Sequence, residues 1–244
     1  MVNILHLGRI GLQSLEPKDV TEFLTQAEFL HIADMLEARW CYDRTQAEKG
    51  MKGLHGRIKS RRHTDEAFNS IPLLALENIR RIMAFQIVKR LPHALKKRRP
   101  AFVAGVPNGA VSLGKEVAEI LGVGFAEMEK REGKIYLTTQ VGARDLLFVD
   151  DFCSHGTAMR EAMRSVHLSQ PDANILMYVA YLLSRGKRSF IPVEEVGIAT
   201  ILSVIKHEVK DWDSKKCDLC DLGSEPIDFK ATPENWNLLM NSQK

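Results

Sequence analysis

The second half of the chain alternates between short apolar runs and segments in which apolar residues recur at helical spacing. Helical spacing is found in 111–121, which Gly122 ends, and again in 158–166. The apolar runs have the length of buried strands and lie at 101–106, 123–128, 146–149, 174–183 and 198–205. Apolar strands that alternate with helices are typical of a parallel sheet covered on both faces. The pattern therefore predicts an α/β fold with a central parallel sheet flanked by helices.

The first part of the chain has a different pattern, which predicts mostly helices. Pro17 is suited to the first turn of a helix, and apolar residues at helical spacing extend this helix to about Ala38. A second helix is predicted at about 73–91, and 49–62 is expected to be loop with a short strand. We expect a helical N-terminal region, or hood, in 1–70, the α/β core in 71–210 and a C-terminal tail in 211–244.

Composition and charge narrow the class of protein. With 45% hydrophobic residues the 244-residue chain can bury a full core, and its formal net charge of +3 indicates no dedicated nucleic-acid surface. No apolar run is long enough for a signal peptide or a membrane span, and four cysteines do not make a disulfide scaffold. These features predict a cytoplasmic protein without nucleic-acid or membrane partners, to which anionic small ligands are suited.

The stretch 145–158 carries the clearest chemistry. Four apolar residues form a buried strand, Asp150 and Asp151 follow at its end, and a polar loop leads into a helix. Ligands bind beyond the carboxyl ends of strands in such sheets, and the N–H groups at a helix N-terminus favour a phosphate. The two carboxylates would repel a bare phosphate but accept hydrogen bonds from hydroxyl groups, so the stretch indicates a sugar-phosphate site. Its loop residues are Cys153, Ser154, His155, Gly156, Thr157 and Ala158.

This strand, acidic pair and loop resemble the 5-phosphoribosyl 1-diphosphate (PRPP) motif of type I phosphoribosyltransferases. The resemblance implies that Asp150 and Asp151 bind the ribose hydroxyls and that the loop after them holds the 5′-phosphate. In this chain Gly156-Thr157 stands where Gly-Gly or Gly-Lys is usual, and Ala158 where Thr or Ser is usual. The resemblance also implies a pyrophosphate loop after the first core strand, at Val106, Pro107, Asn108 and Gly109. A Rossmann-like turn with surface acids is the structural alternative.

Three further stretches resemble orotate phosphoribosyltransferases within that family. Residues 59–69 are similar to the base-side loop, which implies that Lys59 contacts the anionic ligands and Phe68 lines the orotate pocket. Residues 129–134 resemble the start of the mobile catalytic loop, and 216–223 resemble a Cys-x-x-Cys tail. The charge of the leaving group would be met by the basic residues of the loop, for which solvated surface charges are the alternative reading: Lys130, Arg131 and Lys134.

The resemblance also implies a reaction and its participants. N1 of orotate would attack C1 of PRPP and give orotidine 5′-monophosphate and pyrophosphate, a step of pyrimidine nucleotide biosynthesis. Mg²⁺ would bind through PRPP near Asp150 and Asp151, without direct protein ligands, and the enzyme would be a homodimer. Two other functions stay open: a phosphoribosyltransferase for another base, such as a purine, and a non-catalytic PRPP-binding regulator.

Cys217 and Cys220 have the spacing of half a zinc site, which needs about four ligands in all. The chain has no second Cys-x-x-Cys, and the nearest histidine, His207, lies ten residues before Cys217. A mononuclear metal site inside one chain is therefore not expected, and a packed structural turn is the expected role of the pair; metal binding between subunits stays open.

Overall fold

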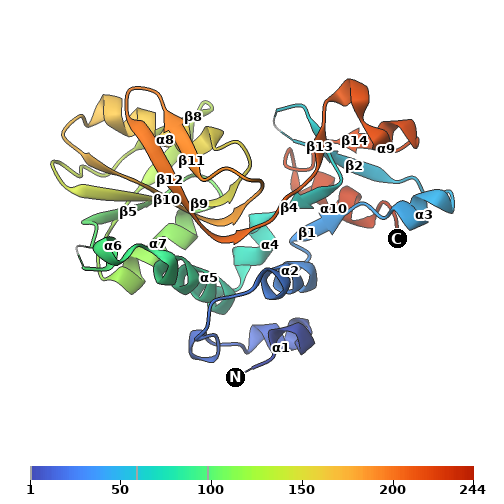
Figure 1. The fold of residues 1–244 in the computed structure, drawn as a ribbon, viewed down its shortest axis with the longest axis horizontal. Helices are drawn as coiled ribbons and strands as arrows, with labels where there is room; N and C mark the ends of the chain where they lie inside the picture. The colour runs from blue at the N-terminus through green and yellow to red at the C-terminus, as the bar shows by residue number, and fades with distance from the viewer. Residues whose placement is uncertain (1, 59, 98) are drawn as a thin grey trace.

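The computed structural model describes residues 2–58, 60–97 and 99–244. Figure 1 shows two lobes, an α/β core that contains the central sheet and a smaller lobe that contains the C-terminus; the N-terminus lies apart from this lobe, beside α1 (Arg9–Gln13). We call the smaller lobe the hood; among the described residues it consists of 39–58, 60–68 and 211–244, a different set from the 1–70 expected from the sequence. Within the described residues, no helix is both long and apolar enough to cross a bilayer.

The central sheet has six strands in the order β11, β12, β10, β9, β5, β6. Neighbouring strands are parallel except for the edge strand β11, which pairs antiparallel with β12. The fold class predicted from the alternating pattern is therefore confirmed. In sheet order the strands span Phe190–Val193, Gly197–Lys206, Asn174–Ser184, Asp145–Cys153, Phe102–Gly105 and Gly124–Ala126.

Helices cover both faces of this sheet, as the fully apolar strands require. Successive residues of β9 alternate between the two faces: Leu147 and Val149 belong to one apolar cluster, and Leu146 and Phe148 to the other. On the first face lie α2 (Gln26–Met35), α5 (Glu77–Arg90) and α7 (Val111–Leu121). On the second lie α8 (Thr157–Ser169) and the hairpin of β7 (Met128–Arg131) and β8 (Lys134–Leu137).

The order of the strands fixes where a ligand can bind. After β5 the chain crosses to β6 on one side, and it then returns to β9 on the other side of β5. The loops that follow β5 and β9 therefore lead away in opposite directions, which opens a crevice at their carboxyl ends. The predicted pyrophosphate loop follows β5, and the predicted 5′-phosphate loop follows β9.

Two predicted helices differ in their bounds. The helix expected from Pro17 to about Ala38 is a short 3₁₀ turn, η2 (Pro17–Asp19), followed by α2, because Thr25 and Glu28 form a capping box that starts the helix later. The helix expected at 73–91 is divided at Leu76, whose backbone is extended, into α4 (Ser70–Ala75) and α5. The remaining helices of this part are η1 (Ile4–His6), α1 (Arg9–Gln13) and α6 (His93–Lys97).

The hood combines an early segment of the chain, which begins at residue 39, with the C-terminal tail. Its four-stranded sheet has the order β13, β3, β2, β14, so strands from the C-terminal tail flank strands from the N-terminal region (Figure 1). The boundary expected at residue 211 thus does not separate the tail in space, because strand pairing joins it to the hood. The hood elements are β1 (Arg39–Cys41), α3 (Arg44–Glu48), β2 (Leu54–Arg57), β3 (His63–Thr64), β4 (Glu66–Phe68), β13 (Asp211–Trp212), η3 (Ser214–Lys216), α9 (Asp218–Asp221), β14 (Glu225–Ile227) and α10 (Pro233–Asn241).

Candidate functional site

The acidic pair lies near the carboxyl end of β9. Asp150 is 8% exposed, and its Oδ1 accepts a hydrogen bond from the backbone N–H of Asp151 at 2.9 Å. Asp151 is half-buried, and its Oδ1 accepts one from the N–H of Phe152. Burial raises the pKa of Asp150 well above its usual value, and the charge of Asp151 raises it further. The pair therefore suits a ligand that brings hydroxyl donors or positive charge.

The loop after the acidic pair turns sharply into α8. Gly156 precedes the helix with a left-handed backbone (φ 69°), and a Cβ at this residue would lie 2.7 Å from Ile191 Cδ1. No described side chain caps α8, and the N–H groups of a first helical turn have no acceptor within their helix. Arg160 donates from Nη1 to the carbonyl oxygen of His155 at 2.7 Å. The loop thus combines backbone N–H donors with a guanidinium, which suits a phosphate.

The burial and exposure of the other loop residues do not indicate a nucleophile. Cys153 is 2% exposed, and burial raises the pKa of its thiol to about 11. Its thiol is therefore protonated at neutral pH and unreactive. Ser154 and Thr157 are exposed, and Ala158 packs partly against the apolar cluster under α8.

The predicted pyrophosphate turn reaches the acidic pair. Val106 extends the pairing of β5, since its N–H donates to the carbonyl oxygen of Val149 at 2.8 Å, and the Pro107–Asn108 peptide bond that follows is cis. Gly109 then lies so close to Asp151 that a Cβ would be 2.1 Å from Asp151 Oδ2. The crevice between β5 and β9 thus brings together two stretches that lie about 40 residues apart in the sequence.

The segment expected as the start of a mobile loop is a tight hairpin. Glu132 and Gly133 form the turn between β7 and β8, both with positive φ (50° and 83°), as a two-residue type I′ turn requires. The basic side chains Lys130, Arg131 and Lys134 are exposed, and Arg131 forms an ion pair with Glu129. Within the described residues, no hydrogen bond or ion pair joins these three to the acidic pair.

Of the two residues predicted to bind the base, the structure describes only Phe68. Lys59 lies outside the described residues. Phe68 is only 2% exposed, and its ring packs against those of Phe152 at 5.8 Å and His207 at 6.0 Å between centroids. Through Phe152 the residue lies close to the acidic pair, but other side chains cover its ring, which was expected to line a pocket.

An arginine that the sequence interpretation missed lies at the same edge of the sheet. Arg185 directly follows β10, and its backbone N–H donates to the carbonyl oxygen of Cys153 at 2.7 Å. Its Nη2 donates to Thr64 Oγ1 and to the carbonyl oxygen of Glu66, at 3.2 and 3.1 Å. Its Nε is shielded from solvent and has no hydrogen-bond partner among the described residues. The position directly after an apolar core strand was a signal for this residue.

A second missed cation comes from the C-terminal tail. Lys230 Nζ lies over the ring of Phe152, 5.8 Å from its centroid, and its charge lowers the pKa of Asp150 against the larger effect of burial. No local pattern marks Lys230, because only the folding of the tail into the hood brings it to the site.

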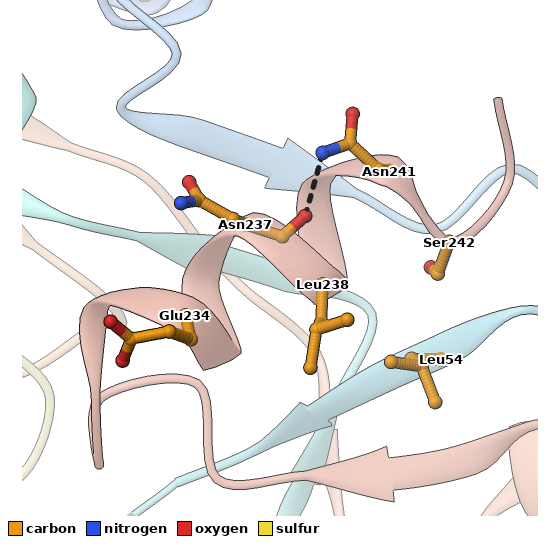
Figure 2. A pocket seen from close by; sticks show the side chains of 6 residues that line it. All are labelled: Leu54, Glu234, Asn237, Leu238, Asn241 and Ser242. Carbon is orange, nitrogen blue, oxygen red and sulfur yellow. Dashed lines mark hydrogen bonds between the residues drawn. The ribbon is translucent and has the colours of Figure 1, made fainter.

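One hollow on the surface lies away from the loops after β5 and β9. Figure 2 shows its lining between α10 and β2 of the hood, from Leu54, Glu234, Asn237, Leu238, Asn241 and Ser242. The hollow is mainly apolar, and none of its lining residues belongs to the loops after β5 or β9. A second hollow is lined in part by Gly186, Lys187 and His207, which follow β10 and β12 near Arg185.

The Cys-x-x-Cys pair lies beside histidines that its position in the sequence did not indicate. His207 is bonded elsewhere, since its Nε2 lies 2.7 Å from Glu66 Oε2. The structure instead brings His55 and His63, eight residues apart on β2 and β3, against the two thiols. Their sequence distance from the cysteines hid this group, although a pair of histidines near a predicted short strand was a usable signal.

Comparison with known proteins gives a likeness at the level of structure. No protein-family model matches the chain, and neither does any curated protein. The orotate phosphoribosyltransferase of Aeropyrum pernix is similar with a TM-score of 0.55 and 15% identity, over 72% of this chain and 92% of that one. UMP synthase of Leishmania donovani is similar with a TM-score of 0.51 and 14% identity, over 85% of this chain and 41% of that one. At such identities the likeness concerns the fold alone: this chain has the α/β fold of the type I phosphoribosyltransferases.

Proposed function

We propose that the protein transfers the 5-phosphoribosyl group of PRPP to orotate. A bond forms between N1 of orotate and C1 of the ribose, the bond from C1 to the pyrophosphate oxygen breaks, and pyrophosphate leaves with its electron pair, while the proton of N1–H is released to water. The observation that carries the proposal is the buried acidic pair, Asp150 and Asp151, between a glycine turn and the N-terminus of α8. A ribose phosphate presents both hydroxyl groups and a phosphate to such a pair.

Each part of PRPP has a matching group in this arrangement. The ribose hydroxyls donate hydrogen bonds to Asp150 and Asp151, and the 5′-phosphate accepts them from the first N–H groups of α8. The pyrophosphate lies along Val106–Gly109, and Lys230 adds positive charge from the hood over Phe152, near the acidic pair. The protein's part in the reaction is to orient the reactants and to stabilise charge, because no nucleophilic side chain is needed.

The proposal includes a divalent cation and a homodimer. Carboxylate oxygens are the ligands that Mg²⁺ prefers. In Asp150 and Asp151 one oxygen of each carboxylate accepts a backbone N–H, and no backbone N–H of the described residues binds the other, so the pair fits an ion held mainly by PRPP. An Mg²⁺ ion bound there would neutralise part of the negative charge of the pyrophosphate. We also propose that the exposed cations of the β7–β8 hairpin, Lys130, Arg131 and Lys134, meet the leaving group in the homodimer.

Arg185 favours orotate over a neutral base. Its shielded Nε has no hydrogen-bond partner in the described part of the chain, and a buried N–H without an acceptor costs about 1–3 kcal/mol, more when it is charged. A carboxylate would satisfy this donor and pair with the charge. Orotate carries a carboxylate, whereas adenine and the other neutral purine bases do not.

A base panel tests the proposal. The protein is supplied with PRPP, Mg²⁺ and orotate, adenine, guanine, hypoxanthine or uracil in turn, and loss of each base and release of pyrophosphate are followed. We expect turnover with orotate alone. Turnover with a purine alone contradicts the assignment of the base, and PRPP-dependent thermal stabilisation without any turnover contradicts catalysis.

Replacing Arg185→Met tests the role of the arginine. Because a lost charge-assisted hydrogen bond costs about 1.5–3 kcal/mol, we expect KM for orotate to rise by roughly 10- to 100-fold. Stabilisation by PRPP alone should persist, since Arg185 is assigned to the base. Arg81→Met, at an exposed ion pair with Glu119, is the control and should leave both unchanged. A variant that loses PRPP binding and orotate binding together would contradict this assignment.

A further inference from the structure

Four potential metal ligands converge in the hood, away from the acidic pair. They are His55 of β2, His63 of β3, and Cys217 and Cys220 at α9. Their ligand atoms all lie within 4.8 Å of one another. We propose that these four side chains bind one zinc ion, which fastens the C-terminal tail to the N-terminal strands of the hood.

The distances fit a tetrahedral ion. Both sulfur atoms lie 3.6 Å from His55 Nε2, Cys220 Sγ lies 3.4 Å from His63 Nδ1, and the two nitrogens are 3.0 Å apart. Zn–S bonds of about 2.3 Å and Zn–N bonds of about 2.0–2.1 Å, at tetrahedral angles, separate sulfur from nitrogen by about 3.6 Å and nitrogen from nitrogen by about 3.3 Å. The sulfur–nitrogen distances agree with this geometry, and the nitrogen–nitrogen distance is slightly short.

A hydrogen-bond chain orients one of the imidazoles toward the proposed ion. Ser224 Oγ donates to the carbonyl oxygen of Gly53 at 3.1 Å, and the same oxygen lies 2.9 Å from His55 Nδ1. Because the hydroxyl proton is used on Gly53, Ser224 accepts from Nδ1–H of His55. This leaves the lone pair on Nε2, the nitrogen that faces the sulfur atoms. Metal-binding histidines are usually held by such a bond on their other nitrogen.

The chemistry of the four side chains selects the metal. Thiolate and imidazole ligands suit zinc, whereas Mg²⁺ prefers oxygen. His55, His63 and Cys217 are at most 4% exposed, so the group is closed to solvent on most sides. A site with four protein ligands has no open position for a substrate, which is typical of structural zinc.

The position of the group gives the ion its role. Cys217 and His55 are 162 residues apart in the sequence, and they join the tail to a sheet with a small apolar core of its own. Small lobes with little core are often held together by a metal. The inference is independent of the proposed transferase activity, since none of the four residues belongs to the loops after β5 or β9.

Metal analysis of the folded, untagged protein, purified under reducing conditions, tests the proposal. We expect one zinc ion per chain and X-ray absorption that reports two sulfur and two nitrogen neighbours. After exchange for Co²⁺, thiolate charge-transfer bands and intense tetrahedral d–d bands should appear. Reduced, folded protein that binds neither Zn²⁺ nor Co²⁺ in this way overturns the proposal, as does a zinc ion whose neighbours are mainly oxygen.

Two cysteine variants assign the site. Cys220→Ser should lose most of its zinc, whereas Cys41→Ser, at an exposed cysteine outside the group, should keep one ion per chain. Since Cys220→Ser can also lower stability, the wild-type protein is treated with a chelator in parallel. Its melting temperature should fall and recover with Zn²⁺ but not with Mg²⁺. Full zinc content in Cys220→Ser, or a melting temperature indifferent to chelation and zinc, overturns the assignment.

Discussion

Asp150→Asn is expected to abolish most of the phosphoribosyl transfer while it stabilises the folded protein. Loss of one preorganised charge at a reacting centre typically costs about 100- to 1,000-fold in kcat. The folded state nevertheless gains, because burial raises the pKa of Asp150 well above its usual value, so ionisation of this carboxyl group costs the folded wild-type protein stability that asparagine does not lose. Turnover with PRPP and the melting temperature measure the two effects in one variant.

The pH dependence gives this prediction its sign. Since the folded state holds the Asp150 proton more tightly than the unfolded state, the wild-type protein loses stability as pH rises from about 4 through the raised pKa. Asparagine does not titrate, so the advantage of the variant in melting temperature should grow over that range, by about 2–4 °C for each kcal/mol. Asp172→Asn, at an exposed carboxylate, is the control. Unchanged turnover in Asp150→Asn, or an advantage that shrinks with pH, would contradict the account.

Gly109→Ala is expected to weaken PRPP turnover through Asp151. The added methyl group would start 2.1 Å from Asp151 Oδ2 and 2.9 Å from Ser70 Oγ, so the carboxylate has to move. Displacement of a positioning group by about 1 Å can cost on the order of 100-fold in rate. Kinetics with varied PRPP should show this as a raised KM together with a lowered kcat.

The matched control for this substitution is Gly8→Ala. Gly8 has nothing within 4 Å of its added Cβ, and its φ of −77° is open to alanine. Gly8→Ala should leave KM for PRPP and kcat unchanged. If Gly109→Ala behaves in the same way, the turn after β5 does not approach the acidic pair in solution as described.

The sequence is informative about the core because local pattern and burial agree there. The strand at 146–149 is apolar on both faces, and Gly122 marks the end of α7 with a left-handed backbone. The edge strand β11 escaped prediction because it is short and interrupted by Pro192, and such strands have little pattern of their own. The late start of α2 depended on the cap at Thr25, which outweighed the proline signal eight residues earlier.

In the candidate site, too, some residues could be predicted from the sequence and others could not. Asp150 and Asp151 could be found because their strand and loop are continuous in the sequence. Arg185 had the signal of following a core strand, but only sheet pairing places it beside Cys153. Lys230 had no such signal, since only the folding of the tail brings it near the acidic pair. His55 and His63 were hidden for the same reason. Side chains brought together over long sequence separations leave no local periodicity to detect.

The pairing of early and late strands in the hood has a consequence for folding during synthesis on the ribosome. β2 pairs with β14, which begins 171 residues after Leu54. At 5–20 residues per second, the N-terminal strands of the hood wait roughly 10–30 s for their partner to be synthesised. During that time β2 and β3 expose unpaired edges while the core strands are already available to fold. Nascent chains stalled before Asp211 should therefore bind holdase chaperones through the segment around β2, and release should follow the synthesis of the tail.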